Sequence, residues 1–491
     1  MKKRVSKRSF RTKNTTFVSF IHWANNFAMR KKIRYIILAV LWIGAGVWVA
    51  SRWDAWFSIP DEPFYLPKAV PERLMLTFGN ESERSRNISW RCDTVLKNSA
   101  VELSLGKQEV QRIQAEGEIF ESRSGKAAYY VCRLRELMPD TVYRYRVCTG
   151  GAYSEWHTFR TYELDRNHFS FLYVGDVQDT DGASVNALLR RGLQAHQTEF
   201  MVCSGDLTER PSDNHWEDAF RALDSIAQNI PVIASTGNHD FLKNIPRKLE
   251  KRFPLVFSYF LDSMVGVNQV YSLRYGQAEL FVLDSNREVN YLWEQRQWLV
   301  EKLQASDANW KILILHHPLH SIKGAANNLI QRWMFDDLVR EYGVDLVLQG
   351  HEHAYARMSS LDEAGQKVTP VYVVSHCSPK HYRIEFNDKF DRYGISSRYY
   401  QVVKIAADTL SMSVYELDSN DLYDSIQIIK SGIAERGGVV DEALEIPENM
   451  SFSPRPNKRK DREYEERILE YMKEHPEKEF KRWSLLDFEE K

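Results

Sequence analysis

Five segments of the sequence each combine an apolar run with residues that can bind metal or move protons. They read FSFLYVGD (169–176), EFMVCSGD (199–206), PVIASTGNHD (231–240), WKILILHHP (310–318) and VDLVLQGHEH (344–353). Each apolar run is typical of a buried strand in an α/β sheet, where ligands gather outside the carboxyl ends of the strands. The pair His351 and His353 alone would fit a surface loop equally well. Five such strand ends together predict one metal site.

In this order the motifs resemble the calcineurin-like metallophosphoesterase superfamily. The β-rich segment that precedes them, together with GHEHAYAR (350–357), narrows the resemblance to relatives of the purple acid phosphatases, over roughly residues 72–417. The metal ligands that the resemblance implies are Asp176 and His353 in one site, Asn238, His316 and His351 in the other, and Asp206 between the two. It also implies that His239 is the acid that protonates the leaving alcohol, although a purely structural role for this histidine remains open.

The ligand types suit two adjacent divalent or trivalent ions. Asp206 has two carboxylate oxygens, so it can bridge both ions and offset their mutual repulsion. Mixed oxygen and imidazole ligation favours Fe, Mn or Zn over Ca. A two-metal centre polarises phosphoryl oxygens and lowers the pKa of a bridging water, which becomes the hydroxide nucleophile. The expected cofactors are therefore two metal ions.

Two positions depart from the family pattern. Glu209 in GDLTE (205–209) stands where purple enzymes have the tyrosine that colours the ferric ion, and Gln178 follows the first motif in GDVQ (175–178). We predict Gln178 as a ligand of the first ion and Glu209 as a neighbour of the ligands. Without a phenolate to stabilise Fe(III), the enzyme is expected to lack the purple colour and to prefer divalent ions. Further residues that could touch the substrate or support the ligands, or simply pack, are His320, Tyr355 and Arg357.

The remaining chain divides by pattern. Residues 71–162 contain short alternating strands and, at Leu137–Tyr143, the spacing of a tyrosine corner, so they resemble a fibronectin type III module that scaffolds or docks. Residues 165–417 are predicted to form an α/β metallophosphatase domain, a four-layer β-sandwich flanked by helices. Residues 52–70 are expected to be a linker. Residues 418–491 form a charged C-terminal extension, in which Arg462 to His475 could make a solvated helix.

The N-terminus indicates a membrane anchor. Residues 1–34 carry many Lys and Arg and no acidic residue, and residues 35–51 are uncharged throughout. This pattern predicts an uncleaved signal anchor at 35–51, with a basic cytoplasmic arm before it and the catalytic domain outside the cytoplasm, in the periplasm or at the cell surface if the source is bacterial. A cleaved signal peptide is the alternative.

The predicted function is metal-dependent hydrolysis of phosphate esters, most simply as a phosphomonoesterase on small-molecule or protein-linked substrates. A formal net charge of -1 gives no reason to expect nucleic acid as a partner. Two alternatives remain. A phosphodiesterase for nucleotides or lipid head groups would use the same chemistry, and a catalytically impaired scaffold or adhesion protein would use the β-rich module.

Overall fold

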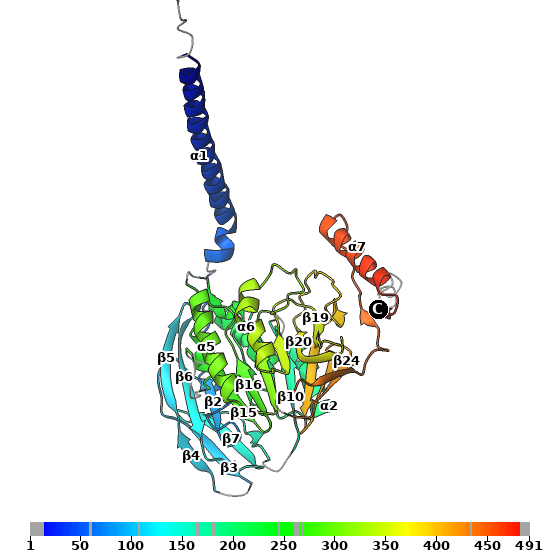
Figure 1. Cartoon of the computed structure of the whole chain (residues 1–491). Helices are drawn as coiled ribbons and strands as arrows, with labels where there is room; N and C mark the ends of the chain where they lie inside the picture. The colour runs from blue at the N-terminus through cyan, green and yellow to red at the C-terminus, as the bar shows by residue number, and fades with distance from the viewer. Residues whose placement is uncertain are drawn as a thin grey trace, which may run out of the picture. The chain divides into compact units, whose positions relative to one another are not determined.

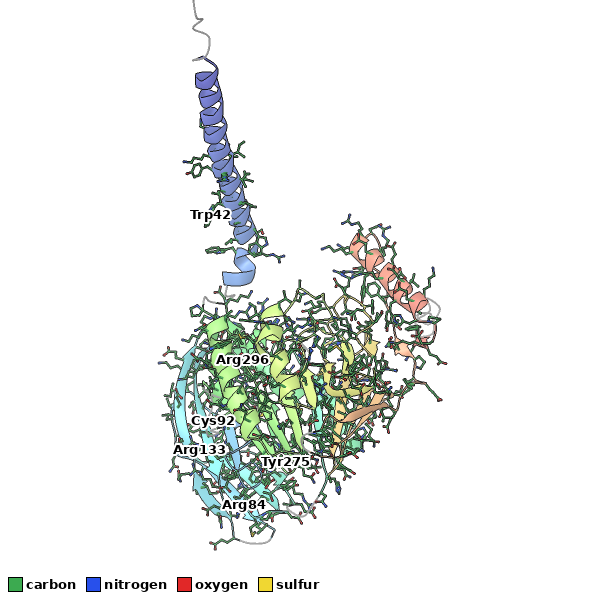
Figure 2. The ribbon with its side chains drawn as sticks, in the orientation of Figure 1. Trp42, Arg84, Cys92, Arg133, Tyr275 and Arg296 are labelled. Carbon is green, nitrogen blue, oxygen red and sulfur yellow. The ribbon has the colours of Figure 1, made fainter. Side chains whose placement is uncertain are left out.

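The computed structural model describes residues 14–57, 61–106, 109–163, 167–178, 182–243, 246–259, 265–266, 269–432 and 435–481. It divides into two compact units, Met1–Pro60 and Asp61–Lys491. The first unit is the helix α1 (Asn14–Phe57), drawn in dark blue in Figure 1. Its segment Lys31–Trp53 has a mean hydropathy of 2.0 and is long and apolar enough to cross a membrane. The predicted span 35–51 lies inside it. The linker predicted from residue 52 begins later, because the helix continues to Phe57.

The second unit starts with a β-sandwich. One sheet has the order β1-β2-β6-β5, and the other has the order β4-β3-β7-β8 with β9 also paired to β7. The strands are β1 (Glu72–Phe78), β2 (Arg86–Arg91), β3 (Ser99–Leu105), β4 (Gln111–Gln114), β5 (Glu116–Ser122), β6 (Gly125–Leu134), β7 (Val142–Thr149), β8 (Ala152–Tyr153) and β9 (His157–Arg160). Trp90 stacks on Tyr130 in the core. The Tyr143 hydroxyl accepts the Met138 N–H at 2.9 Å, which is the predicted tyrosine corner.

A buried cluster of charges joins this sandwich to the domain that follows. Asp213 begins helix α3 (Asp213–Ala222), and its carboxylate meets three guanidinium groups. Arg73 and Arg91 of the sandwich lie 2.8 and 2.6 Å away, and Arg252 of helix α4 (Arg252–Val256) lies at 2.8 Å. Buried charges are stable only when they are paired. The cluster therefore ties the two domains into one compact unit.

The second domain is built on a 14-stranded sheet with the order β12-β11-β10-β22-β23-β24-β25-β20-β18-β17-β16-β15, to which β19 and β21 are added. Its first half contains β10 (Phe169–Val174), β11 (Phe200–Cys203), β12 (Val232–Ala234), β22 (Tyr399–Ile405), β23 (Thr409–Glu416), β24 (Leu422–Ile429) and β25 (Gly438–Asp441). Its second half contains β15 (Tyr271–Tyr275), β16 (Ala278–Val282), β17 (Trp310–Ile314), β18 (Leu346–Gln349), β19 (Tyr355–Leu361), β20 (Lys367–Val374) and β21 (Arg392–Gly394). Within the halves, β10, β11 and β12 run parallel, as do β16, β17, β18 and β20. Short pairs are β13 (Phe241–Leu242) with β14 (Lys248–Leu249), and β26 (Glu448–Asn449) with β27 (Phe480–Lys481).

Side-chain alternation shows how the halves are layered. Leu346 and Leu348 of β18 share a core cluster with β10 and β22 of the other half. Val347, between them, belongs instead to the cluster with helices α5 (Val289–Ala305) and α6 (Leu329–Glu341). Since alternate residues of a strand point to opposite faces, the two halves face each other and helices cover the outside. Figure 1 shows α5 and α6 side by side over one half, and α2 (Gly182–His196) lies with the other. The predicted four-layer α/β fold is confirmed.

The C-terminal boundary predicted at residue 417 is wrong. Strand β24 pairs antiparallel with β23 and continues to β25, so the sheet extends past this residue. Helix α7 (Arg459–Glu474) is not a solvated helix either, because Tyr464, Ile468 and Tyr471 are buried in the core cluster that contains α5 and α6. The high charge density of this helix conceals one apolar face, and that face decides where it packs.

Candidate metal centre

The parallel strands bring the predicted ligands to one edge of the sheet. Asp176 and Gln178 follow β10, Asp206 follows β11, and the short helix η1 (Asn238–Asp240) follows β12. His316 follows β17, and His351 and His353 follow β18. Ligand atoms of Asp206, His316 and His351 all lie within 4.8 Å of one another. Five strand ends therefore meet at one site, as their composition predicts.

The backbone at these strand ends is unusual. Asp176, Asp206, His351 and His353 all have positive φ angles, of 43°, 51°, 72° and 44°. Such angles are uncommon for residues other than glycine, although Asp, Asn and His adopt them more readily than most. Backbone strain of this kind clusters at functional sites, where the surrounding structure maintains it. The sharp turns bring these side chains back towards one another.

Two glycines permit a close approach to the carboxylates. A Cβ atom on Gly350 would lie 2.2 Å from Asp176 Oδ2, and one on Gly237 would lie 2.0 Å from Asp206 Oδ1. Because glycine has no Cβ, the backbone can approach both carboxylates. The His351 N–H donates to Asp176 Oδ2 at 2.7 Å, and the His239 N–H donates to Asp206 Oδ1 at 2.8 Å. Each carboxylate is thus fixed through one oxygen, and its second oxygen is available for a cation.

The first half of the centre is built on Asp176, Gln178 and His353. Asp176 Oδ1 lies 3.4 Å from His353 Nε2, which is also 3.4 Å from the Gln178 amide. Asp176 Oδ1 and Gln178 Oε1 are buried and have no hydrogen-bond partner. Buried polar atoms normally have one, so these two orphaned oxygens fit a cation. His353 Nδ1 lies 3.0 Å from the Lys380 carbonyl, to which it can donate, leaving Nε2 unprotonated for a metal.

The second half contains His316, Asn238 and His351. His316 Nδ1 lies 2.9 Å from the Ser204 carbonyl, which orients the ring. Its Nε2 lies 3.2 Å from Asn238 Oδ1, 3.2 Å from Asp206 Oδ2 and 3.3 Å from His351 Nδ1. Two imidazole nitrogens, an amide oxygen and a carboxylate oxygen converge here. This donor set suits the borderline transition metals and zinc.

The protonation states of these groups fit metal binding. Burial raises the pKa of Asp206, but the adjacent His316 and His239 outweigh burial and hold it well below its usual range. Burial and the charges of His317 and His316 hold the pKa of His351 well below its usual value. Burial lowers the pKa of His316, but Asp206 outweighs this effect and raises the pKa to about 9. In the metal-free chain a proton on His316 therefore occupies a position that favours positive charge, and a cation would replace it.

His239 is placed differently from the ligands. Its Nδ1 lies 2.5 Å from the Glu209 carbonyl, and its Nε2 lies 3.9 Å from Asp206 Oδ2. The side chain is 30% exposed, whereas that of His316 is fully buried. With Nδ1–H donating to a carbonyl, the exchangeable proton of the ring is on Nε2. His239 therefore faces the centre from its open side.

Comparison with known proteins agrees with this geometry. The family model of the calcineurin-like phosphoesterases matches residues 169–355, and that of the purple acid phosphatase N-terminal domain matches residues 71–161. The chain contains a calcineurin-like phosphoesterase domain behind a purple acid phosphatase N-terminal domain. The predicted fibronectin-like module is this N-terminal domain. These matches support a phosphatase enzyme of the calcineurin-like phosphoesterase type.

Individual relatives support the same conclusion. Phosphoenolpyruvate phosphatase from Allium cepa is 26% identical over 341 residues, which cover 64% of this chain and 67% of that protein. Human acid phosphatase type 7 is 24% identical over 325 residues, or 60% of this chain and 72% of the relative. The solved structure of purple acid phosphatase PPD1 from yellow lupin covers 74% of each chain with a TM-score of 0.61 at 15% identity, which shows the shared fold.

The structure places the other predicted residues of this phosphatase outside the ligand cluster. The Glu209 carboxylate pairs with Lys380, and His320 Nε2 lies 2.9 Å from Asp336 of α6. Tyr355 and Arg357 are buried, and both bind Asp424 of β24, at 2.6 and 2.8 Å. Among the described residues, the hydrogen bonds and ion pairs of His320, Tyr355 and Arg357 fit the packing alternative, and none of them joins these side chains to the ligands.

Some supporting groups of the phosphatase site are not evident in the sequence. Ser204 and Lys380 orient His316 and His353 through backbone carbonyls, so their residue types carry no signal. Tyr382 packs its ring 4.4 Å from that of His353. It lies in an irregular segment between β20 and β21, where no strand pattern predicts its position.

Proposed function

We propose that this phosphatase hydrolyses phosphate monoesters with two metal ions held by the predicted ligands. The observation that carries the proposal is the convergence of Asp206, His316 and His351 within 4.8 Å, beside the orphaned oxygens of Asp176 and Gln178. In the proposed assignment Asp176, Gln178 and His353 hold one ion, Asn238, His316 and His351 hold the other, and Asp206 serves both. When bound, the ions would polarise the phosphate and activate a water molecule.

Residues of the chain orient the proposed metal ligands and supply a proton to the departing alcohol. The hydrogen bonds from the backbone amides of His351 and His239 fix the two carboxylates. The Ser204 and Lys380 carbonyls fix the tautomers of His316 and His353. His239, held by the Glu209 carbonyl, offers the proton on Nε2 to the departing alcohol oxygen.

The absence of a ligand tyrosine after β11 supports an enzyme without purple colour. Glu209 occupies that position, and its carboxylate is paired with Lys380. No phenolate follows Asp206 on this loop to stabilise a ferric ion. We therefore assign the centre to divalent ions.

We further propose that α1 is a signal anchor that holds the catalytic domain outside the cytoplasm. The support is the apolar segment Lys31–Trp53, preceded by a basic arm without acidic residues. The positive-inside rule places such an arm in the cytoplasm.

The test of the catalytic proposal is metal analysis combined with two assays. Purified full-length protein should hold about two ions per chain, hydrolyse 4-nitrophenyl phosphate, and hydrolyse bis(4-nitrophenyl) phosphate more slowly. Chelation should abolish activity, and divalent ions should restore it. Faster hydrolysis of the diester would make the chain a phosphodiesterase, and loaded protein that hydrolyses neither ester would refute the proposal.

A further inference from the structure

A buried carboxylate holds the loop after β17 against the ligand segment. Glu352 stands between His351 and His353 and is 1% exposed. Its carboxylate accepts the Ser321 hydroxyl at 2.6 Å and the Ile322 N–H at 2.6 Å. These two hydrogen bonds fix the chain immediately before Lys323. The position of Lys323 is therefore determined by the segment that carries two of the proposed metal ligands.

The Lys323 ammonium lies over an aromatic ring beside the centre. Its Nζ is 4.5 Å from the centroid of the Tyr382 ring, and the Tyr382 ring is 4.4 Å from that of His353. A cation over the face of an aromatic ring is attracted to its π-electrons. Lys323 thus contacts Tyr382, which contacts a proposed ligand. The ammonium lies at the rim of the centre rather than among the ligands.

The Glu352 carboxylate lies near enough to interact with the charge of Lys323, but the two groups do not form a direct ion pair. Across the part of the chain that the structure describes, no carboxylate lies within ion-pair distance of its Nζ, whereas the neighbouring Lys380 is paired with Glu209. An unpaired cation at the rim complements an anion that the bound substrate would bring.

We propose that Lys323 determines specificity by binding a second anionic group of the substrate, carried on the alcohol side of the scissile phosphate. This inference rests on the proposed phosphatase function and names its substrate class. The preferred substrates are phosphate monoesters that bear a carboxylate or a further phosphate a few bonds from the ester oxygen. The scissile phosphate is placed by the centre itself, so Lys323 discriminates between alcohols rather than between esters and non-esters.

The test compares two substrates that differ in one charge, phosphoglycolate and its carboxyl methyl ester. Wild-type enzyme should prefer phosphoglycolate by about tenfold in kcat/KM, the effect of one charge-assisted hydrogen bond. Lys323→Gln should bring this ratio close to one, and Lys323→Arg should restore most of it. The matched control is Lys389→Gln, because Lys389 is an exposed lysine of the segment that also carries Tyr382. This control should keep the wild-type ratio.

Three outcomes would overturn the inference: no preference in wild-type enzyme, an unchanged preference in Lys323→Gln, or an equal loss on both substrates with metal content intact. Calorimetric binding of phosphonoacetate against methylphosphonate makes the same comparison without turnover. A binding preference that depends on Lys323, in loaded protein that hydrolyses no ester, would refute the proposed function and leave this inference standing. Equal binding of the two phosphonates would overturn the inference by itself.

Discussion

The role of His239 is the sharpest prediction of the site. Its Nδ1 donates to the Glu209 carbonyl, so Nε2, which lies 3.9 Å from Asp206 Oδ2, is the ring nitrogen that can transfer a proton. A positioned general acid contributes about 10²–10⁴-fold to the rate, which corresponds to roughly 3–5 kcal/mol of transition-state stabilisation. His239→Ala should lose this factor on alkyl phosphates, whose leaving oxygens are strongly basic. The loss should be much smaller on nitrophenyl phosphate, whose leaving group departs as an anion.

The assay measures kcat for wild type and variant on a series of monoesters with graded leaving-group pKa, with metal content determined on the same samples. The slope of log kcat against that pKa should become steeper in His239→Ala. The matched control is His320→Gln, because His320 is bonded to Asp336 and not to the ligand cluster. It should leave the slope unchanged.

An equal loss for His239→Ala across the whole series, with both ions retained, would refute the reasoning. It would show that the imidazole supports Asp206 or the fold without transferring a proton. A loss of metal in His239→Ala would assign the residue to the ligand set instead.

The remaining predictions concern the ions, stability and topology. Asp206→Asn should abolish activity on all esters alike and reduce metal content, because Asp206 is proposed to serve both ions; retained metal and activity would contradict a bridging role. Loaded protein should show no intense visible charge-transfer band, and a purple preparation would require a tyrosine ligand. Burial raises the pKa of Glu250 to about 7 from an ordinary 4.5, so its contribution to stability is full below pH 4.5 and is lost as the pH rises through 7. Glu250→Gln should therefore flatten the decline in Tm between pH 5 and 8, an effect of roughly 3 kcal/mol, and an unchanged pH profile would refute it. A reporter fused after Lys491 should behave as exported and stay with membranes after high-salt washing, whereas a soluble form that begins near Arg52 would show signal-peptide cleavage.

Much of the site could be predicted from the sequence because its ligands obey a local rule. Four of the five apolar runs are followed by glycine and then Asp, Asn or His, and the fifth by His directly. Parallel strands bring their carboxyl ends to one edge. Asp176, Asp206, His316 and His351 need only this rule to be brought together. Gly237 and Gly350 could also be predicted from the local sequence, because only glycine permits the backbone to approach the carboxylates so closely.

The tertiary structure alone decided what depends on partners distant in the sequence. Tyr355 and Arg357 follow the GHEH motif directly, yet their partner Asp424 lies on a strand about 70 residues later. Helix α7 belongs to the core through Tyr464, Ile468 and Tyr471, although most of its residues are charged. Lys323 and Tyr382 come together because Glu352 holds the loop that carries Lys323, while the Tyr382 N–H donates to the His353 carbonyl at 3.3 Å. Local patterns report which residues end a strand, whereas the position of an irregular loop depends on long-range hydrogen bonds and packing that no short segment of sequence encodes.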